Sequence, residues 1–270
     1  MSTATENAAP QRAGTMPWKV FFLLAALGAV GSAAVLPYAV SGFGGAAEAA
    51  GVPRPLLALA TFLQGLLLVT VSAFVGLRLA RRTALGAPVL EALVYRKRPL
   101  PDLRPLLGLS ALLGAAAGGA IIALDLAFAP FVDLSLAEGA RLPSWWQGLL
   151  ASLYGGICEE IMMRLGVLNL VVWLLSLRQA AGAPRGAWVV WTAILAASVL
   201  FGVGHLGGAA AAFELTPMLV ARVLVLNAVP GVMFGLLFWK KGLLAAMSAH
   251  FAANLVLHVA LPLVRDVLLA

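Results

Sequence analysis

Long apolar runs alternate with short polar or basic segments along almost the whole chain. A helix needs about 20 apolar residues to cross the hydrocarbon core of a bilayer. Seven runs reach that length, at residues 18–40, 56–79, 105–128, 144–177, 186–213, 217–239 and 242–264. The pattern therefore predicts an all-α fold, a polytopic helical membrane protein with about seven transmembrane helices.

The fourth run is longer than one perpendicular span requires. It opens at Ser144, a residue type that caps helix N-termini well, and continues with Trp145 and Trp146, a residue type enriched at membrane interfaces. We expect this helix to tilt, or its start to lie along the interface as a separate eighth helix.

The composition agrees with a membrane protein. The chain has 270 residues, of which 62% are hydrophobic and 11% are charged, against about 45–50% and about 25% in ordinary soluble domains. These values exclude a soluble globular enzyme and a disordered chain, and the single cysteine, Cys158, excludes an intramolecular disulfide. Any chemistry must be carried out by residues inside the bilayer or at its edge.

The net charge of +7 comes from Lys and Arg residues that flank the apolar runs. With the N-terminus in the cytoplasm, thirteen of them fall in cytoplasmic segments and three in outer segments, and the segment 78–104 is the most basic. This asymmetry predicts a multi-pass protein of the cell's inner (plasma) membrane, N-terminus inside and C-terminus outside. Membrane lipid is the expected partner of the basic segments, and no nucleic acid is expected.

We divide the chain into three parts. Residues 1–16 are expected to form a disordered tail, residues 17–143 an N-terminal membrane region with three helices, and residues 144–270 the core that carries the chemistry. The first apolar run has some features of a cleavable signal peptide. No polar mature start follows it, so we expect it to be retained.

Ionisable residues interrupt the fourth run. Inside a membrane helix such residues are costly and indicate a functional site by default. Glu160 and Arg164 are four residues apart, so they share one face of a helix and can form an ion pair. Glu159 is rotated by about 100° from Glu160 and has no such partner. Glu159 is therefore the carboxylate that is free to face a cavity.

Polar residues also interrupt the fifth and seventh runs. His205 lies nine residues before Glu214, and His250 lies nine residues after Lys241, which places each about 13.5 Å from the end of its run. The two glutamates lie near the middle of the fourth run. All these side chains are therefore expected at similar depth, near the middle of a core about 30 Å thick.

These clusters resemble the signature of the CPBP family, the CAAX proteases and bacteriocin-processing enzymes, and specifically a bacterial member of its type II CAAX prenyl protease and Abi-like proteins. The family pattern is Glu-Glu-x-x-x-Arg, then Phe-x-x-x-His, then His-x-x-x-Asn, on successive membrane helices. The chain carries all three parts in this order: Glu159, Glu160 and Arg164; Phe201 and His205; His250 and Asn254. The resemblance covers roughly residues 144–258.

The resemblance implies a glutamate-dependent intramembrane protease. Glu159 would be the general base that activates water, His205 would hold that water, and His250 and Asn254 would stabilise the oxyanion. Glu160, Arg164 and Phe201 would be supporting residues. No cofactor is expected; if zinc were bound instead, Glu159, His205 and His250 would be its ligands.

The expected substrate is a small membrane protein or peptide with a hydrophobic tail, cleaved near its membrane-associated, C-terminal segment. Whether it is prenylated, and the oligomeric state, stay open. Two other functions fit intramembrane ionisable residues: a non-catalytic immunity or binding protein, and a proton-coupled transporter. We expect His258 to be a hydrogen-bonding residue behind the site, Arg222 to snorkel or pair with Glu214, and Cys158 to be buried.

Overall fold

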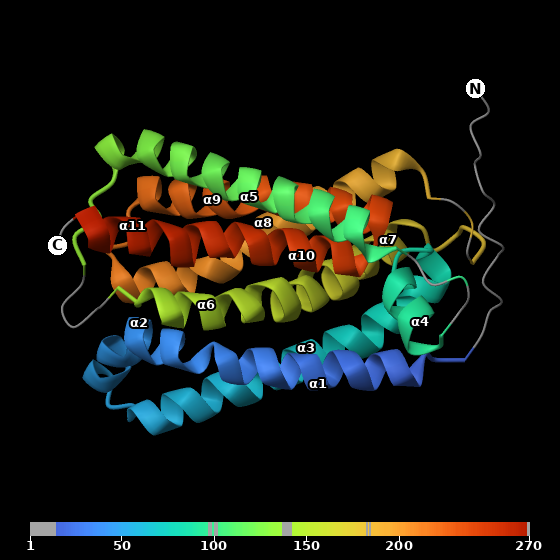
Figure 1. Ribbon diagram of the computed structural model, residues 1–270, viewed down its shortest axis with the longest axis horizontal. Helices are drawn as coiled ribbons and strands as arrows, with labels where there is room; N and C mark the ends of the chain where they lie inside the picture. The colour runs from blue at the N-terminus through green and yellow to red at the C-terminus, as the bar shows by residue number, and fades with distance from the viewer. Residues whose placement is uncertain are drawn as a thin grey trace.

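The computed structural model describes residues 15–96, 99, 102–136, 142–181, 183 and 185–268. Within these ranges every regular element is a helix (Figure 1), as the apolar pattern predicts. Most of the expected disordered tail, parts of the basic segment 78–104 and the two C-terminal residues lie outside the described residues.

The elements follow the apolar runs closely. In chain order they are α1 (Trp18–Ala34), α2 (Leu36–Ala49), α3 (Arg54–Thr83), α4 (Pro88–Val94), α5 (Leu103–Phe128), η1 (Ala129–Phe131), α6 (Trp145–Tyr154), η2 (Gly155–Glu159), η3 (Ile161–Leu168), α7 (Asn169–Leu175), α8 (Ala187–Ala212), α9 (Pro217–Lys241), α10 (Leu243–Leu255), η4 (Val256–Ala260) and α11 (Leu261–Leu268).

By length and composition, five described helices can cross a membrane, and six if the bent pair α1 and α2 forms one span. The sequence predicted about seven. The difference lies in the fourth run, where α6, η2, η3 and α7 follow one another and no single piece is long enough to count. Because α6 passes directly into η2 at Gly155, the start of this run is not a separate helix.

Local chemistry explains where the elements begin. Ser144 and Gln147 form a reciprocal capping box at the start of α6, as a helix N-terminus requires. α1 and α2 meet at an angle of 47° beside Val35, and Pro37 occupies the first turn of α2. A proline there cannot donate the hydrogen bond that would continue α1.

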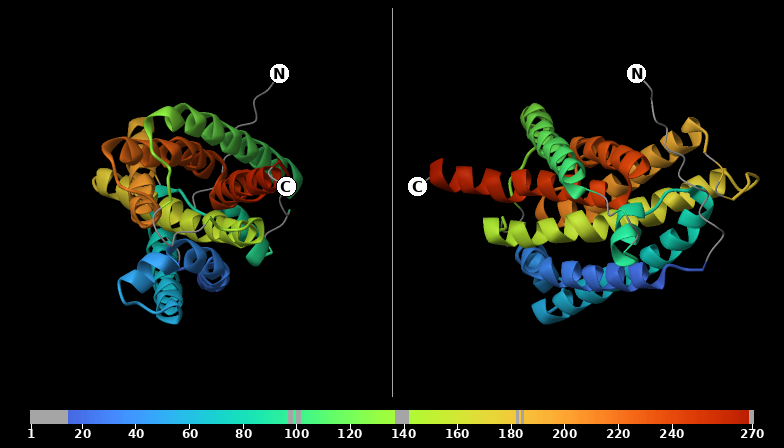
Figure 2. Two further views of the ribbon diagram at one scale, coloured as in Figure 1. Left: turned by 90° about the vertical axis from the view of Figure 1, so that its left-hand side faces the viewer. Right: turned by 45° about the vertical axis from the view of Figure 1, so that its right-hand side comes forward.

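The helices are arranged around α10. Helix α5 packs along α10 on one side, α9 and the π-helical segment η2 contact it on others, and α8 packs along α9. Figures 1 and 2 show α1, α2 and α3 (blue to cyan) on one side of this group and α5 (green) on the other. Helix α5, although it precedes the predicted core in the chain, is therefore packed directly on it.

Small residues allow these close contacts. A Cβ atom on Gly114 of α5 would overlap the carbonyl oxygen of Ala249 of α10. A Cβ on Gly235 of α9 would lie 2.9 Å from a methyl carbon of Ile194 of α8. Gly114 of α5 and Gly235 of α9 therefore serve close helix packing, as is common in membrane proteins.

We predict that Gly114→Ala lowers the free energy of unfolding by about 1–3 kcal/mol, because α5 and α10 must move apart. Gly119→Ala is the matched control, since a Cβ there meets no atom within 4 Å. Its thermal unfolding in detergent should match or slightly exceed that of the wild type. Equal melting of the two variants would contradict the assigned α5–α10 contact.

Candidate active site

The helix that carries Glu159 and Glu160 is widened into π-helical turns on both sides of Glu160, at Gly155–Glu159 and Ile161–Leu168. Such turns are rare and are often found at functional sites. Gly155 and Gly156 lie at the start of the first, where α10 passes closely. A Cβ on Gly155 would overlap the side-chain nitrogen of Asn254. A Cβ on Gly156 would lie 2.9 Å from the Cβ atom of Phe251.

Glu160 points away from the cavity and is completely buried. Its Oε1 lies 3.1 Å from Nη1 of Arg164, and this ion pair was predicted from the spacing. The same Oε1 lies 2.7 Å from Nδ1 of His250, a contact that spacing could not reveal because the two residues are 90 positions apart. Glu160 therefore joins two helices as well as pairing within its own.

Arg164 is held on several sides. Its Nη2 donates a hydrogen bond to the carbonyl oxygen of Gly231, at 3.0 Å. Its guanidinium carbon lies 5.3 Å from the ring centre of Phe201 and 5.4 Å from that of Phe234. Cation–π contacts of this kind are strongest where water is excluded, and the side chain of Arg164 is only 1% exposed.

The hydrogen bond to Glu160 sets which ring nitrogen of His250 carries a proton when Glu160 is ionised. An ionised carboxylate only accepts hydrogen bonds, so Nδ1 of His250 must carry a proton. Nε2 of the same ring lies 3.5 Å from Oε2 of Glu159. The ring stacks on Phe234, with centres 4.6 Å apart and planes at 18°. The two glutamates at the ring nitrogens and Phe234 against the ring plane therefore fix the orientation of His250.

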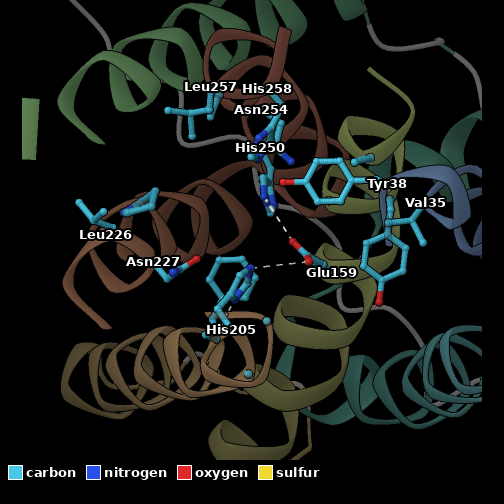
Figure 3. A pocket seen from close by; sticks show the side chains of 18 of the residues that line it. Val35, Tyr38, Glu159, His205, Leu226, Asn227, His250, Asn254, Leu257 and His258 are labelled. Carbon is cyan, nitrogen blue, oxygen red and sulfur yellow. Dashed lines mark hydrogen bonds and ion pairs between the residues drawn. The ribbon is translucent and has the colours of Figure 1, made fainter. Parts of the chain in front are cut away.

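Glu159 faces the cavity, with 18% of its side chain exposed. Its Oε1 lies 4.0 Å from Nε2 of His205, and its two oxygens thus face two different histidines (Figure 3). Nδ1 of His205 lies 2.8 Å from the carbonyl oxygen of Phe201. Since a carbonyl only accepts, that nitrogen donates, and a neutral His205 presents a bare Nε2 toward Glu159.

The cavity beside this cluster has a volume of about 560 Å³. It is lined by Glu159, His205, His250 and Asn254, the four residues predicted to be catalytic, and by the supporting residue Phe201. Glu160 and Arg164 lie behind this wall. The structure thus brings all seven predicted residues into one contiguous site built from η2, η3, α8 and α10.

The expectations for Arg222, Cys158 and His258 can also be compared with the structure. Arg222 does not pair with Glu214: its Nη2 and Nε each lie 2.6 Å from Oδ1 of Asp125 on α5, a partner too distant in sequence to infer. Cys158 is fully buried, with Sγ 3.5 Å from the carbonyl oxygen of Gly28, as expected.

His258 was expected behind the site but lines the cavity. Tyr38 and Gln64 also line it and were not singled out, because they come from the N-terminal half and belong to no motif. An unpaired polar residue within an apolar run was the only signal that could have found Gln64.

The cluster has balanced charges when His250 is protonated. Glu159 and Glu160 supply two negative charges, and Arg164 and a protonated His250 supply two positive ones. Among the residues that the structure describes, no group of three or more His, Cys, Asp or Glu is arranged to hold a metal ion. The site can offer a partly exposed carboxylate, a bare imidazole nitrogen and hydrogen-bond donors to one reacting group.

The fold and this cluster define a multi-pass membrane protein with a group of ionisable side chains beside a cavity between its helices. Residues 141–256 match the model of the family described as type II CAAX prenyl endopeptidase Rce1-like. These residues form a domain of that family, which implies an intramembrane protease. No curated protein and no solved structure matches the chain.

We predict that Arg164→Ala lowers the free energy of unfolding by about 3–5 kcal/mol, because the buried Glu160 loses its cationic partner. The matched control is Arg54→Ala, which removes the exposed Arg54–Glu48 pair and should cost less than about 1 kcal/mol. Thermal unfolding in detergent measures both. Melting of Arg164→Ala at the wild-type temperature would show that Glu160 does not depend on this charge.

Proposed function

We propose that the protein is an intramembrane endopeptidase that cleaves a peptide bond near the membrane-associated, C-terminal segment of a small membrane protein or peptide. The observation that carries this proposal is the position of Glu159: a partly exposed carboxylate on a cavity wall, between the Nε2 atoms of two histidines at 4.0 and 3.5 Å.

Glu159 and His205 together can hold the attacking water. A separation of 4.0 Å is too long for a direct hydrogen bond but suits a bridge through one water molecule. The water would donate one hydrogen to Glu159 and the other to the bare Nε2 of His205. Its oxygen lone pairs are then free to attack a carbonyl carbon as Glu159 takes the proton.

His250 and Asn254 would stabilise the tetrahedral intermediate. A protonated His250 donates from Nε2, and the buried carboxylate of Glu160 stabilises that positive charge through Nδ1. The amide of Asn254 supplies a second donor from the same helix face. When the intermediate collapses, the carbon–nitrogen bond breaks, and the proton held by Glu159 passes to the leaving amine. The products are a carboxylic acid and an amine, which exchange a proton to give a carboxylate and an ammonium group, with no covalent enzyme intermediate.

The walls of the cavity favour an apolar peptide. Besides the polar cluster, they are formed mainly by aliphatic and aromatic side chains of α2, α5, α6, α8, α9, α10 and η4, among them Phe43, Ile121, Leu226 and Leu257. A substrate segment that already lies in the bilayer can enter such a cavity without losing apolar burial. Helices from both halves of the chain, 17–143 and 144–270, contribute these walls.

We predict that Glu159→Gln and His205→Ala each reduce cleavage of a membrane-tethered fluorogenic peptide library by at least about a hundredfold, as expected for loss of a general base or its water-holding partner. Glu48→Gln is the matched control, because it removes an exposed carboxylate on α2 and should leave cleavage unchanged. All variants should retain the wild-type melting temperature within a few degrees.

Full cleavage by folded Glu159→Gln would overturn the assigned mechanism. If the wild type cleaves nothing in the library, a non-catalytic immunity or binding role gains support. Proton flux through reconstituted protein without cleavage would instead support a transporter.

The cytoplasmic orientation of the N-terminus is part of the proposal and rests on the distribution of Lys and Arg. We expect reporter fusions placed within residues 78–104 to be active only for a cytoplasmic reporter, and fusions after residue 268 only for a reporter of the outer side of the plasma membrane. The reverse pattern would contradict this topology.

A further inference from the structure

The cavity extends well beyond the Glu159 cluster. His250, Ala253, Asn254, Leu257 and His258 all line it, and their spacing forms one continuous face of α10 and η4. At 1.5 Å per residue, His258 lies about 12 Å along this face from His250. The cavity therefore has a second polar position, about 6 Å along this face from Asn254 and about 12 Å from His250.

Tyr38 meets His258 at this position. The two rings are in an edge-to-face arrangement, with centres 5.7 Å apart and planes at 74°. Tyr38 reaches the cavity because α2 turns by 47° from α1 just before it. Figure 3 shows its ring entering from α2, with the hydroxyl oxygen directed into the cavity.

Both side chains lack a hydrogen-bond partner within the described part of the chain, although both line the cavity. The backbone at His258 is closely packed, since a Cβ on Gly148 of α6 would overlap the carbonyl oxygen of His258. Two hydrogen-bonding groups that face the cavity, apart from the Glu159 cluster and without a hydrogen-bond partner among the described residues, indicate a ligand with a polar group at this point.

We propose that Tyr38 and His258 form a hydrogen-bonding subsite for an oxygen atom of the bound peptide, either a main-chain carbonyl or a terminal carboxylate. This inference rests on the proposed function. At about 3.3 Å per extended residue, a separation of about 6–12 Å corresponds to roughly two to four residues from the bond that is cleaved. Tyr38 and His258 are positioning residues, and both lie outside the family match at residues 141–256.

The subsite predicts a loss of peptide binding rather than of chemistry. In Tyr38→Phe and in His258→Leu, KM should rise about fivefold to tenfold while kcat stays within about twofold, because the lost hydrogen bond exists in both ground and transition states. His258→Gln keeps a donor and should restore KM to within about threefold of the wild type. Tyr95→Phe, which removes a hydroxyl outside the cavity, is the matched control.

Binding is measured separately from cleavage in the Glu159→Gln background, by fluorescence anisotropy of the tethered library peptides. Each peptide is used with a free terminal carboxylate and with a terminal carboxamide. Weaker binding of both forms on adding Tyr38→Phe or His258→Leu indicates a main-chain carbonyl. Weaker binding of the carboxylate form alone indicates the terminal carboxylate.

The two proposals fail in different ways. Cleavage by the wild type with KM and binding unchanged in Tyr38→Phe and His258→Leu overturns the subsite and leaves the protease. Peptide binding that depends on both residues, without cleavage by the wild type, supports the subsite and overturns the proposed reaction. Loss of kcat with unchanged KM in these variants also overturns the positioning role.

Discussion

The burial of the Glu160 charge between membrane helices is the constraint on which the rest of the site depends. A carboxylate with no solvent exposure is tolerated only if cations and hydrogen-bond donors surround it. Here Arg164 and His250 both contact the same oxygen, at 3.1 and 2.7 Å. These two contacts to Oε1 hold η3 against α10 and set the orientation of the His250 ring.

Glu159, the neighbouring carboxylate, is partly exposed, whereas Glu160 is fully buried. Arg164 is already bound to Glu160, to the carbonyl of Gly231 and to two aromatic rings, so Glu159 faces the cavity and two histidines. Two adjacent glutamates thus have different surroundings and different proposed roles, one as a buried partner of His250 and one as a base. Gly155 and Gly156 of η2 allow α10 to pack closely against the helix that carries both glutamates, because they have no side chains between the two backbones.

Much of this site could be predicted from the sequence because it depends on local spacing. The apolar runs predicted the helices, the separation of four residues predicted the Glu160–Arg164 pair, and the depth of His205 and His250 predicted that they meet. Contacts between helices could not be predicted in this way. Three contacts depend on how one helix is rotated against another. They are the hydrogen bond between Glu160 and His250, the ion pair of Arg222 with Asp125, and the position of Tyr38 in the cavity wall. The π turns were also not predicted, because no residue pattern in the fourth run marks them.

The central claim is that Glu159 activates water with this chain's own side chains. The most direct test is to purify the protein in detergent, determine bound zinc by elemental analysis, and measure peptide cleavage with and without a chelator. The account predicts that metal-free wild-type protein cleaves at the same rate with and without chelator, and that Glu159→Gln does not cleave. Stoichiometric zinc together with cleavage that the chelator abolishes would contradict it, and would make Glu159, His205 and His250 metal ligands.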